Sequence, residues 1–208
     1  MIGYGRQLVT TRGCIDLSCS RQKGLGLLEV LVALLIFSTG MMGLLAIQVA
    51  GKKAGYEATQ RSIATALARD ILERMQANPG QISAYEVNNA GDWENPLSMP
   101  AINCAQADCT PVQLAAFDLW QWESLVLGVS EQQGGSNVGG LVSPRACIFR
   151  EDGLVSVAIS WLGVTSARDS AESTCGSDIA GLYDAPNEAA GNNLRRRQMI
   201  MSTYAGAL

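Results

Sequence analysis

The chain has 208 residues, of which 48% are hydrophobic and only 16% are charged. Its 15 basic and 19 acidic residues give a net charge of −4, whereas a nucleic-acid-binding surface usually needs an excess of basic residues. Histidine is absent, which excludes Ser-His-Asp and Cys-His catalysis, histidine-ligated zinc and imidazole pH switches.

Residues 25–50 form an apolar run in which Glu29 is the one charged residue. A helix of this length measures about 39 Å at about 1.5 Å per residue, which exceeds a hydrocarbon core of about 30 Å. A buried core helix rarely runs this far without a polar face, and a cleaved secretory signal has a shorter apolar region. We therefore predict a transmembrane helix.

The segment before this run, residues 1–24, carries a net charge of +3. The excess of basic residues on cytoplasmic segments places this end in the cytoplasm. Lys52 and Lys53 follow the run and partly oppose that orientation.

Glu29 is the informative exception in the apolar run, because a carboxylate inside a membrane needs a partner. Two sources of positive charge are open. Arg21 and Lys23 could reach toward it from the preceding turns. Alternatively, cleavage after Gly24 would create an ammonium group on Leu25, one helical turn from Glu29, and that amine could also meet the carboxylate of a neighbouring copy.

The residues around this point resemble the class III signal of type IV prepilins and type II secretion pseudopilins. The matching residues are RQKG at 21–24, LGLLE at 25–29 and the apolar run that follows. The resemblance implies that a prepilin peptidase cuts after Gly24 and N-methylates Leu25, and that Glu29 is the fifth-position glutamate used in assembly. The family usually begins its mature chain with Phe, where this chain has Leu25.

Helical periodicity continues beyond the apolar run. Apolar residues form two adjacent rows, and Asn78-Pro79-Gly80 ends the pattern. The rows are Ile63, Leu67, Ile71 and Met75, and Ala64, Ala68 and Leu72. We predict one helix from Leu25 to about Ala77, apolar all round at first and one-sided later, with the later part packed on its own head domain.

The remainder, residues 79–208, is predicted to be an α+β head. Thr110-Pro111 is typical of a helix start, and we predict a helix that runs to about residue 127. One face of this helix carries Ala115, Leu119, Trp122 and Val126. Asp118 and Glu123 are expected to point away from that face. Trp120 and Trp122 are interpreted as packing residues rather than ligand contacts.

A β-hairpin is predicted over residues 145–162, because Asp152-Gly153 is a strong turn dipeptide between two alternating segments. Val155, Val157, Ile159 and Trp161 alternate with small residues, which predicts one buried face. Residues 197–204 are predicted to add a strand, while 129–141 and 164–194 are predicted loops. The run 195–197 of three arginines is interpreted as a solvated strand end.

Six cysteines are present, of which Cys14 and Cys19 fall in the leader. The even number left in the head, Cys104, Cys109, Cys147 and Cys175, fits two disulfides in an exported domain. Of three connectivities we favour the local pairing, Cys104 with Cys109 and Cys147 with Cys175. A zinc site needs two close-spaced pairs, and Cys147 and Cys175 are far apart, so no metal site is expected.

The head is similar to the minor pilin family called type IV pilus modification protein PilV. The similarity lies in the cysteine pair at 104 and 109, the helix residues LAAFDL at 114–119 with Trp122, and a late strand ending in Trp161. It implies a low-abundance pilin that joins other minor pilins and the major pilin in a priming or tip complex of the fibre.

The sequence therefore predicts a pilin-like α+β protein with a leader (1–24), a transmembrane half-helix (25–50), an amphipathic half-helix (51–78) and a periplasmic head (79–208). We expect a single-pass protein of the bacterial inner membrane that later enters the pilus. A minor pseudopilin of type II secretion is the alternative. A membrane enzyme is not favoured, since no nucleophile–base pair or metal-ligand spacing is present. No cofactor, small-molecule substrate or nucleic-acid partner is expected.

Overall fold

The computed structural model describes residues 26–137, 139–167 and 173–204, and the chain divides into two compact units, Met1–Ala46 and Ile47–Leu208. The second unit is called the head below. The elements in chain order are α1 (Leu27–Ala77), the 3-10 segment η1 (Pro79–Tyr85), β1 (Val87–Ala90), α2 (Pro111–Val126), β2 (Gln132–Gln133), β3 (Ser136–Asn137), β4 (Arg145–Glu151), β5 (Leu154–Leu162) and β6 (Arg196–Tyr204).

The described part of the first unit is the beginning of α1. An 18-residue window of this helix has a mean hydropathy of 2.5, and none of that window is buried inside the protein. Its large apolar side chains are exposed, from Leu27 at 83% to Leu45 at 56%. By length and composition, α1 is able to cross a membrane.

The head contains a four-stranded antiparallel sheet in the order β1-β4-β5-β6. The predicted hairpin is confirmed with its predicted bounds, and Arg145 faces Ser160 while Glu151 faces Leu154. Asp152 and Gly153 both have positive φ, as a two-residue primed turn requires. The predicted last strand is also confirmed, although β6 begins one residue earlier, at Arg196.

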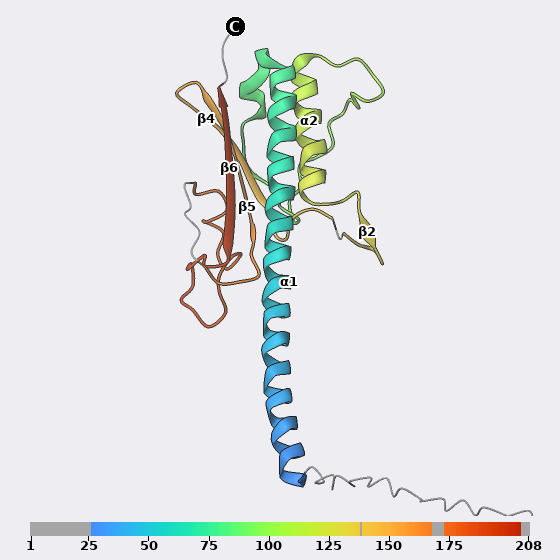
Figure 1. Cartoon of the computed structure of the whole chain (residues 1–208). Helices are drawn as coiled ribbons and strands as arrows, with labels where there is room; N and C mark the ends of the chain where they lie inside the picture. The colour runs from blue at the N-terminus through green and yellow to red at the C-terminus, as the bar shows by residue number, and fades with distance from the viewer. Residues whose placement is uncertain (1–25, 138, 168–172, 205–208) are drawn as a thin grey trace, which may run out of the picture. The chain divides into compact units, whose positions relative to one another are not determined.

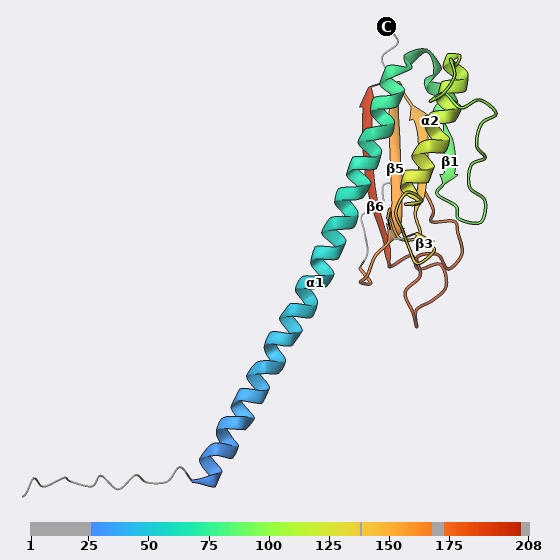
Figure 2. The same cartoon turned by 90° about the vertical axis from the view of Figure 1, so that its right-hand side faces the viewer.

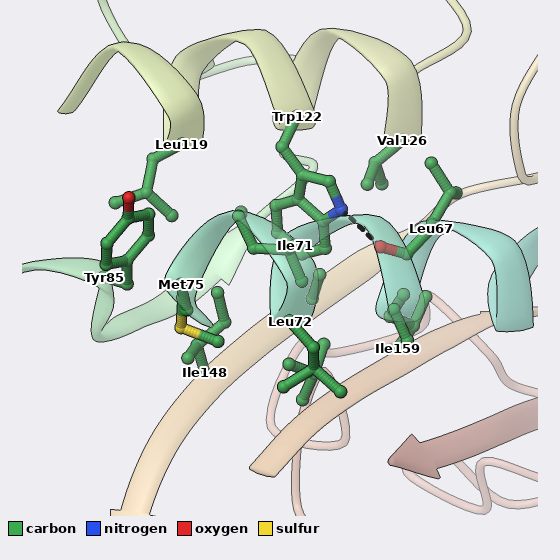
Figure 3. Close-up of a cluster of buried hydrophobic side chains, with 14 of the residues drawn as sticks. Leu67, Ile71, Leu72, Met75, Tyr85, Leu119, Trp122, Val126, Ile148 and Ile159 are labelled. Atoms are coloured by element: carbon green, nitrogen blue, oxygen red, sulfur yellow. Dashed lines mark hydrogen bonds between the residues drawn. The ribbon is translucent and has the colours of Figure 1, made fainter. Parts of the chain in front are cut away.

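The head part of α1 and the whole of α2 cover the same face of this sheet (Figures 1 and 2). In the core, α1 lies between α2 and the strands (Figure 3). Both predicted rows of α1 face this core, and apart from the half-buried Ile63 their members are buried. The α+β pilin-like arrangement predicted from the sequence is therefore confirmed.

Helix α2 begins as predicted, at Thr110 and Pro111. The Thr110 hydroxyl accepts from the Gln113 amide, and the Gln113 side chain accepts in return from the Thr110 amide, at 2.9 Å. This capping box satisfies two groups that a helix N-terminus leaves open. All four residues predicted for the inner face are buried.

Three features of the head differ from the sequence-based expectation. Strand β1, which was not predicted from the sequence, pairs with β4. A short β2–β3 hairpin lies in the predicted loop 129–141. Strand β5 was expected to have one buried face, yet Ala158 and Ser160 on its other face are 0% exposed. The segment around Cys175 covers that face, where the Ser160 hydroxyl donates to the Cys175 carbonyl at 2.9 Å.

Candidate functional site

The beginning of α1 carries the acid that the sequence analysis singled out. Glu29 lies in the first helical turn, and its amide donates to the Gly26 carbonyl at 2.8 Å. A carboxylate is favoured there because the unpaired amides of a helix N-terminus give that end a partial positive charge. Within the described part of the chain, no side-chain partner is recorded for Glu29. Gly24 and Leu25, and with them the predicted cleavage site, lie outside the described residues.

The surroundings of Glu29 are apolar and uncovered. Leu28 is 75% exposed and Val32, one turn further on, is 50% exposed. A single acid on such a helix can pair with a cation brought by the chain itself or by a neighbour. This arrangement is suited to packing against other apolar helices and not to catalysis.

The head contains two buried carboxylates that the sequence analysis placed wrongly. Asp118 and Glu123 were expected to point away from the apolar face of α2, but they are only 8% and 2% exposed. Asp118 accepts from the Tyr85 hydroxyl at 2.7 Å and from the Arg74 guanidinium at 3.1 Å. Arg74 lies in α1 and also pairs with Asp70 of the same helix at 3.0 Å. Its guanidinium therefore bridges a carboxylate of α1 and the Asp118 carboxylate of α2.

Glu123 accepts hydrogen bonds from backbone amides of the loop after β1 and does not pair with a charged side chain among the described residues. Its two carboxylate oxygens accept from the Gly91 amide at 2.7 Å and the Leu97 amide at 2.5 Å. Hydrogen bonds from amides let a carboxylate be buried without a cation. The partners of both acids are far away in sequence, so no local pattern could have revealed them.

The network around Tyr85 predicts an alkaline transition. Burial raises the pKa of Tyr85 from 10 to about 12. Below pH 10 the hydroxyl is neutral in both states, and between pH 10 and 12 only the unfolded chain ionises, so folded stability falls as the pH rises through this window. Urea unfolding measures how much the free energy of unfolding falls between pH 10 and pH 12. This fall should be about 2 kcal/mol smaller in Tyr85→Phe than in the wild type.

Tyr204, which is 74% exposed, provides the matched control for this measurement. Tyr204→Phe should follow the wild-type pH profile. An identical alkaline profile in Tyr85→Phe and wild type would show that Tyr85 is not responsible.

The structure contains two disulfides in the head. They join Cys104 to Cys109 and Cys147 to Cys175, which is the local pairing favoured from the sequence. The first closes a small loop before α2. The second ties β4 to the segment that covers the outer face of the sheet.

The three consecutive arginines do not form a solvated strand end, which corrects the expectation. Arg196 is 6% exposed and donates to the carbonyls of Cys175 and Ser173 at 3.2 and 3.1 Å. Arg195 donates to the Gly163 carbonyl at 3.0 Å. Loop carbonyls brought close by the fold, rather than water, therefore satisfy these guanidinium groups.

The fold and the apolar first helix are pilin-like, and two family models match parts of the chain. Residues 46–120 match the family described as type IV pilin Tt1218, and residues 19–45 match the prokaryotic N-terminal methylation motif. No curated protein and no solved structure matches the chain in the other two comparisons.

The chain is therefore similar to a type IV pilin family over residues 46–120 and carries a match to the N-terminal methylation motif over residues 19–45. Pilins are structural proteins and not enzymes. The motif implies processing by a prepilin peptidase, and the apolar N-terminal helix agrees with a place in the inner membrane and then in the pilus.

Proposed function

We propose that this protein is a minor type IV pilin that joins other minor pilins and the major pilin in a priming or tip complex of the fibre. The single observation that carries the proposal is Glu29, one acid in the first turn of an exposed apolar helix. The resemblance of the head to the PilV family supports the minor role.

In this proposal the leader 1–24 is removed after Gly24 and Leu25 becomes the methylated first residue. Before assembly, residues 25–50 span the inner membrane, residues 51–78 continue the helix into the head, and residues 79–208 lie in the periplasm. N-methylation leaves the α-amine of Leu25 positively charged. The mature subunit therefore carries this positive charge and the negative charge of Glu29 at the same end of an apolar helix.

Charge pairing accounts for how subunits come into register. Lipid and a bundle of apolar helices solvate leucine side chains almost equally, so hydrophobicity alone provides little driving force for leaving the membrane. Removing one partner of a buried charge pair costs about 3–5 kcal/mol. Register is therefore set where the Leu25 ammonium of one subunit meets the Glu29 carboxylate, its own or a neighbour's.

A pseudopilin of type II secretion would share this N-terminal physics. The match of residues 46–120 to a type IV pilin family favours the pilus, because that stretch includes the head part of α1 and most of α2.

Glu29→Gln tests the proposal directly. The variant should be cleaved and should accumulate in membranes like the wild type, because the apolar helix is unchanged. Its amount in sheared pili, relative to the membrane pool, should fall at least about tenfold, since tenfold corresponds to about 1.4 kcal/mol and a lost buried pair costs more. Immunoblots of the two fractions measure the ratio.

Intact-mass and N-terminal analysis of wild-type protein from both fractions completes the test. A chain that begins with N-methylated Leu25 is expected. Ser38→Ala is the matched control, because Ser38 is an exposed polar residue of the same helix segment whose hydroxyl bonds only to the Leu35 carbonyl among the described residues. A native chain that begins at Met1, or wild-type incorporation of Glu29→Gln, would refute the proposal.

A further inference from the structure

A small pocket in the head lies where α1 passes the end of β5 and the start of β6. It has a volume of about 190 Å³. Its lining residues come from three segments of the head, namely Glu57, Ala58 and Arg61 of α1, Trp161 and Thr165 in or after β5, and Arg197 of β6. None of its lining residues belongs to the first unit, which carries Glu29.

Trp161 leaves a polar atom unsatisfied in this pocket wall. Its side chain is 1% exposed, and its indole Nε1 has no hydrogen-bond partner among the described residues. Trp122 provides the contrast, since its Nε1 donates to the Leu67 carbonyl at 2.8 Å (Figure 3). A buried donor without an acceptor is rare in folded proteins and indicates a missing water, ion or ligand.

The two arginines of the pocket differ in what they bind. Arg197 is fully engaged, donating to the carbonyls of Thr165 and Ala167 at 2.7 and 2.8 Å. Arg61 is exposed, and no partner for its guanidinium is recorded among the described residues. The pocket thus combines one fixed cation with one that is open to a ligand.

The acid of the pocket, Glu57, contacts the loop after β5 and Arg197, and no ion pair between Glu57 and Arg61 is present among the described residues. Glu57 accepts from the Val164 amide at 2.7 Å through Oε1 and faces Arg197 Nε at 3.7 Å through Oε2. With two cations and one anion, the pocket has a net positive charge. A ligand that brings negative charge and acceptors for the Arg61 and Trp161 donors would complement it.

We propose that this pocket binds a carboxylate group, and that in the fibre an acidic side chain of a neighbouring subunit supplies it. This second statement rests on the proposed function. The planar fork of a guanidinium matches the two oxygens of a carboxylate, which directs Arg61 toward this ligand class. Removing the leader, which carries +3, takes the chain from −4 to −7, so the mature subunit is acidic overall and the pocket is a local cationic site on it.

Binding is tested with acetate as the probe. Full-length protein in detergent micelles, labelled with ¹⁵N-tryptophan, gives four indole signals, and Trp161→Phe assigns one of them. Acetate should shift the Trp161 signal saturably, with half-saturation at millimolar concentration. Arg61→Gln should raise that concentration at least about fivefold. Arg69→Gln is the matched control, because Arg69 is also an exposed arginine of α1 with no recorded partner among the described residues.

Two outcomes of the titration overturn the carboxylate assignment. One is no response to acetate, which would leave the pocket holding water alone. The other is an equal response to sodium chloride or inorganic phosphate at the same ionic strength, which would show a general ionic effect or a different anion.

The source of the carboxylate is tested in the fibre. Arg61→Glu should lower the amount in sheared pili at least about threefold, while Arg69→Glu should not. Wild-type incorporation of Arg61→Glu, in a protein whose wild type binds acetate, would overturn the neighbouring-subunit source. Failure of the proposed function is distinguishable from failure here, because it would show as an uncut N-terminus or an insensitive Glu29→Gln, neither of which affects the titration.

Discussion

Replacing Trp122 with alanine is expected to lower the free energy of unfolding of the head by about 3–5 kcal/mol. The indole is 0% exposed and occupies the contact between α2 and α1, where its Nε1 also donates to the Leu67 carbonyl (Figure 3). Alanine leaves a cavity and removes that bond, and both effects destabilise the fold. Urea unfolding of the detergent-solubilised protein, followed by circular dichroism, measures the change.

Two companion variants separate the causes of this loss. Trp122→Phe keeps most of the apolar volume and loses the donor, so it should cost clearly less than alanine. Trp120→Ala removes an indole of the same helix that is only half-buried, and about 1 kcal/mol is expected. Equal losses for Trp120→Ala and Trp122→Ala would contradict the central position of Trp122.

Removing the Cys147–Cys175 bridge by a double serine substitution is expected to cost about 3–4 kcal/mol. The bridge spans 28 residues, and in the chain-entropy model a longer loop loses more unfolded-state freedom when it is closed. The bridge also holds the segment whose Cys175 carbonyl accepts from Ser160 and Arg196. The shift of the urea midpoint measures the loss.

The Cys104–Cys109 bridge is the internal control for this prediction, because it spans only 5 residues. Its double serine variant should cost about 2 kcal/mol on the same scale. A loss that equals or exceeds that of the longer bridge would rule out loop closure as the main source of stabilisation.

The elements that the sequence predicted well are those whose pattern is local. The two apolar rows of α1, the Thr110-Pro111 start of α2 and the Asp152-Gly153 turn each follow from residues within one or two turns of each other. The apolar first segment with one acid is equally local, which is why the candidate assembly site could be named before any fold was known.

The elements that were missed depend on partners distant in sequence. Glu123 is buried because the Gly91 and Leu97 amides come to it, and Arg196 is buried because the Cys175 and Ser173 carbonyls do. A charged residue in a helix or strand carries no local sign that such partners exist. Short β1 was missed for a similar reason, since its pairing with β4 is visible only in the sheet.

The two hydrogen bonds that Glu123 accepts have a consequence for how this sequence can vary. It fixes the backbone at Gly91 and Leu97, and the Cys104–Cys109 bridge fixes the next point along the chain. The stretch between these two anchors includes Met99, which is 54% exposed, and adds nothing to the buried core. Mutation and small insertions can therefore accumulate there at little cost to folding, which gives the subunit a surface that selection can redesign while the scaffold stays the same.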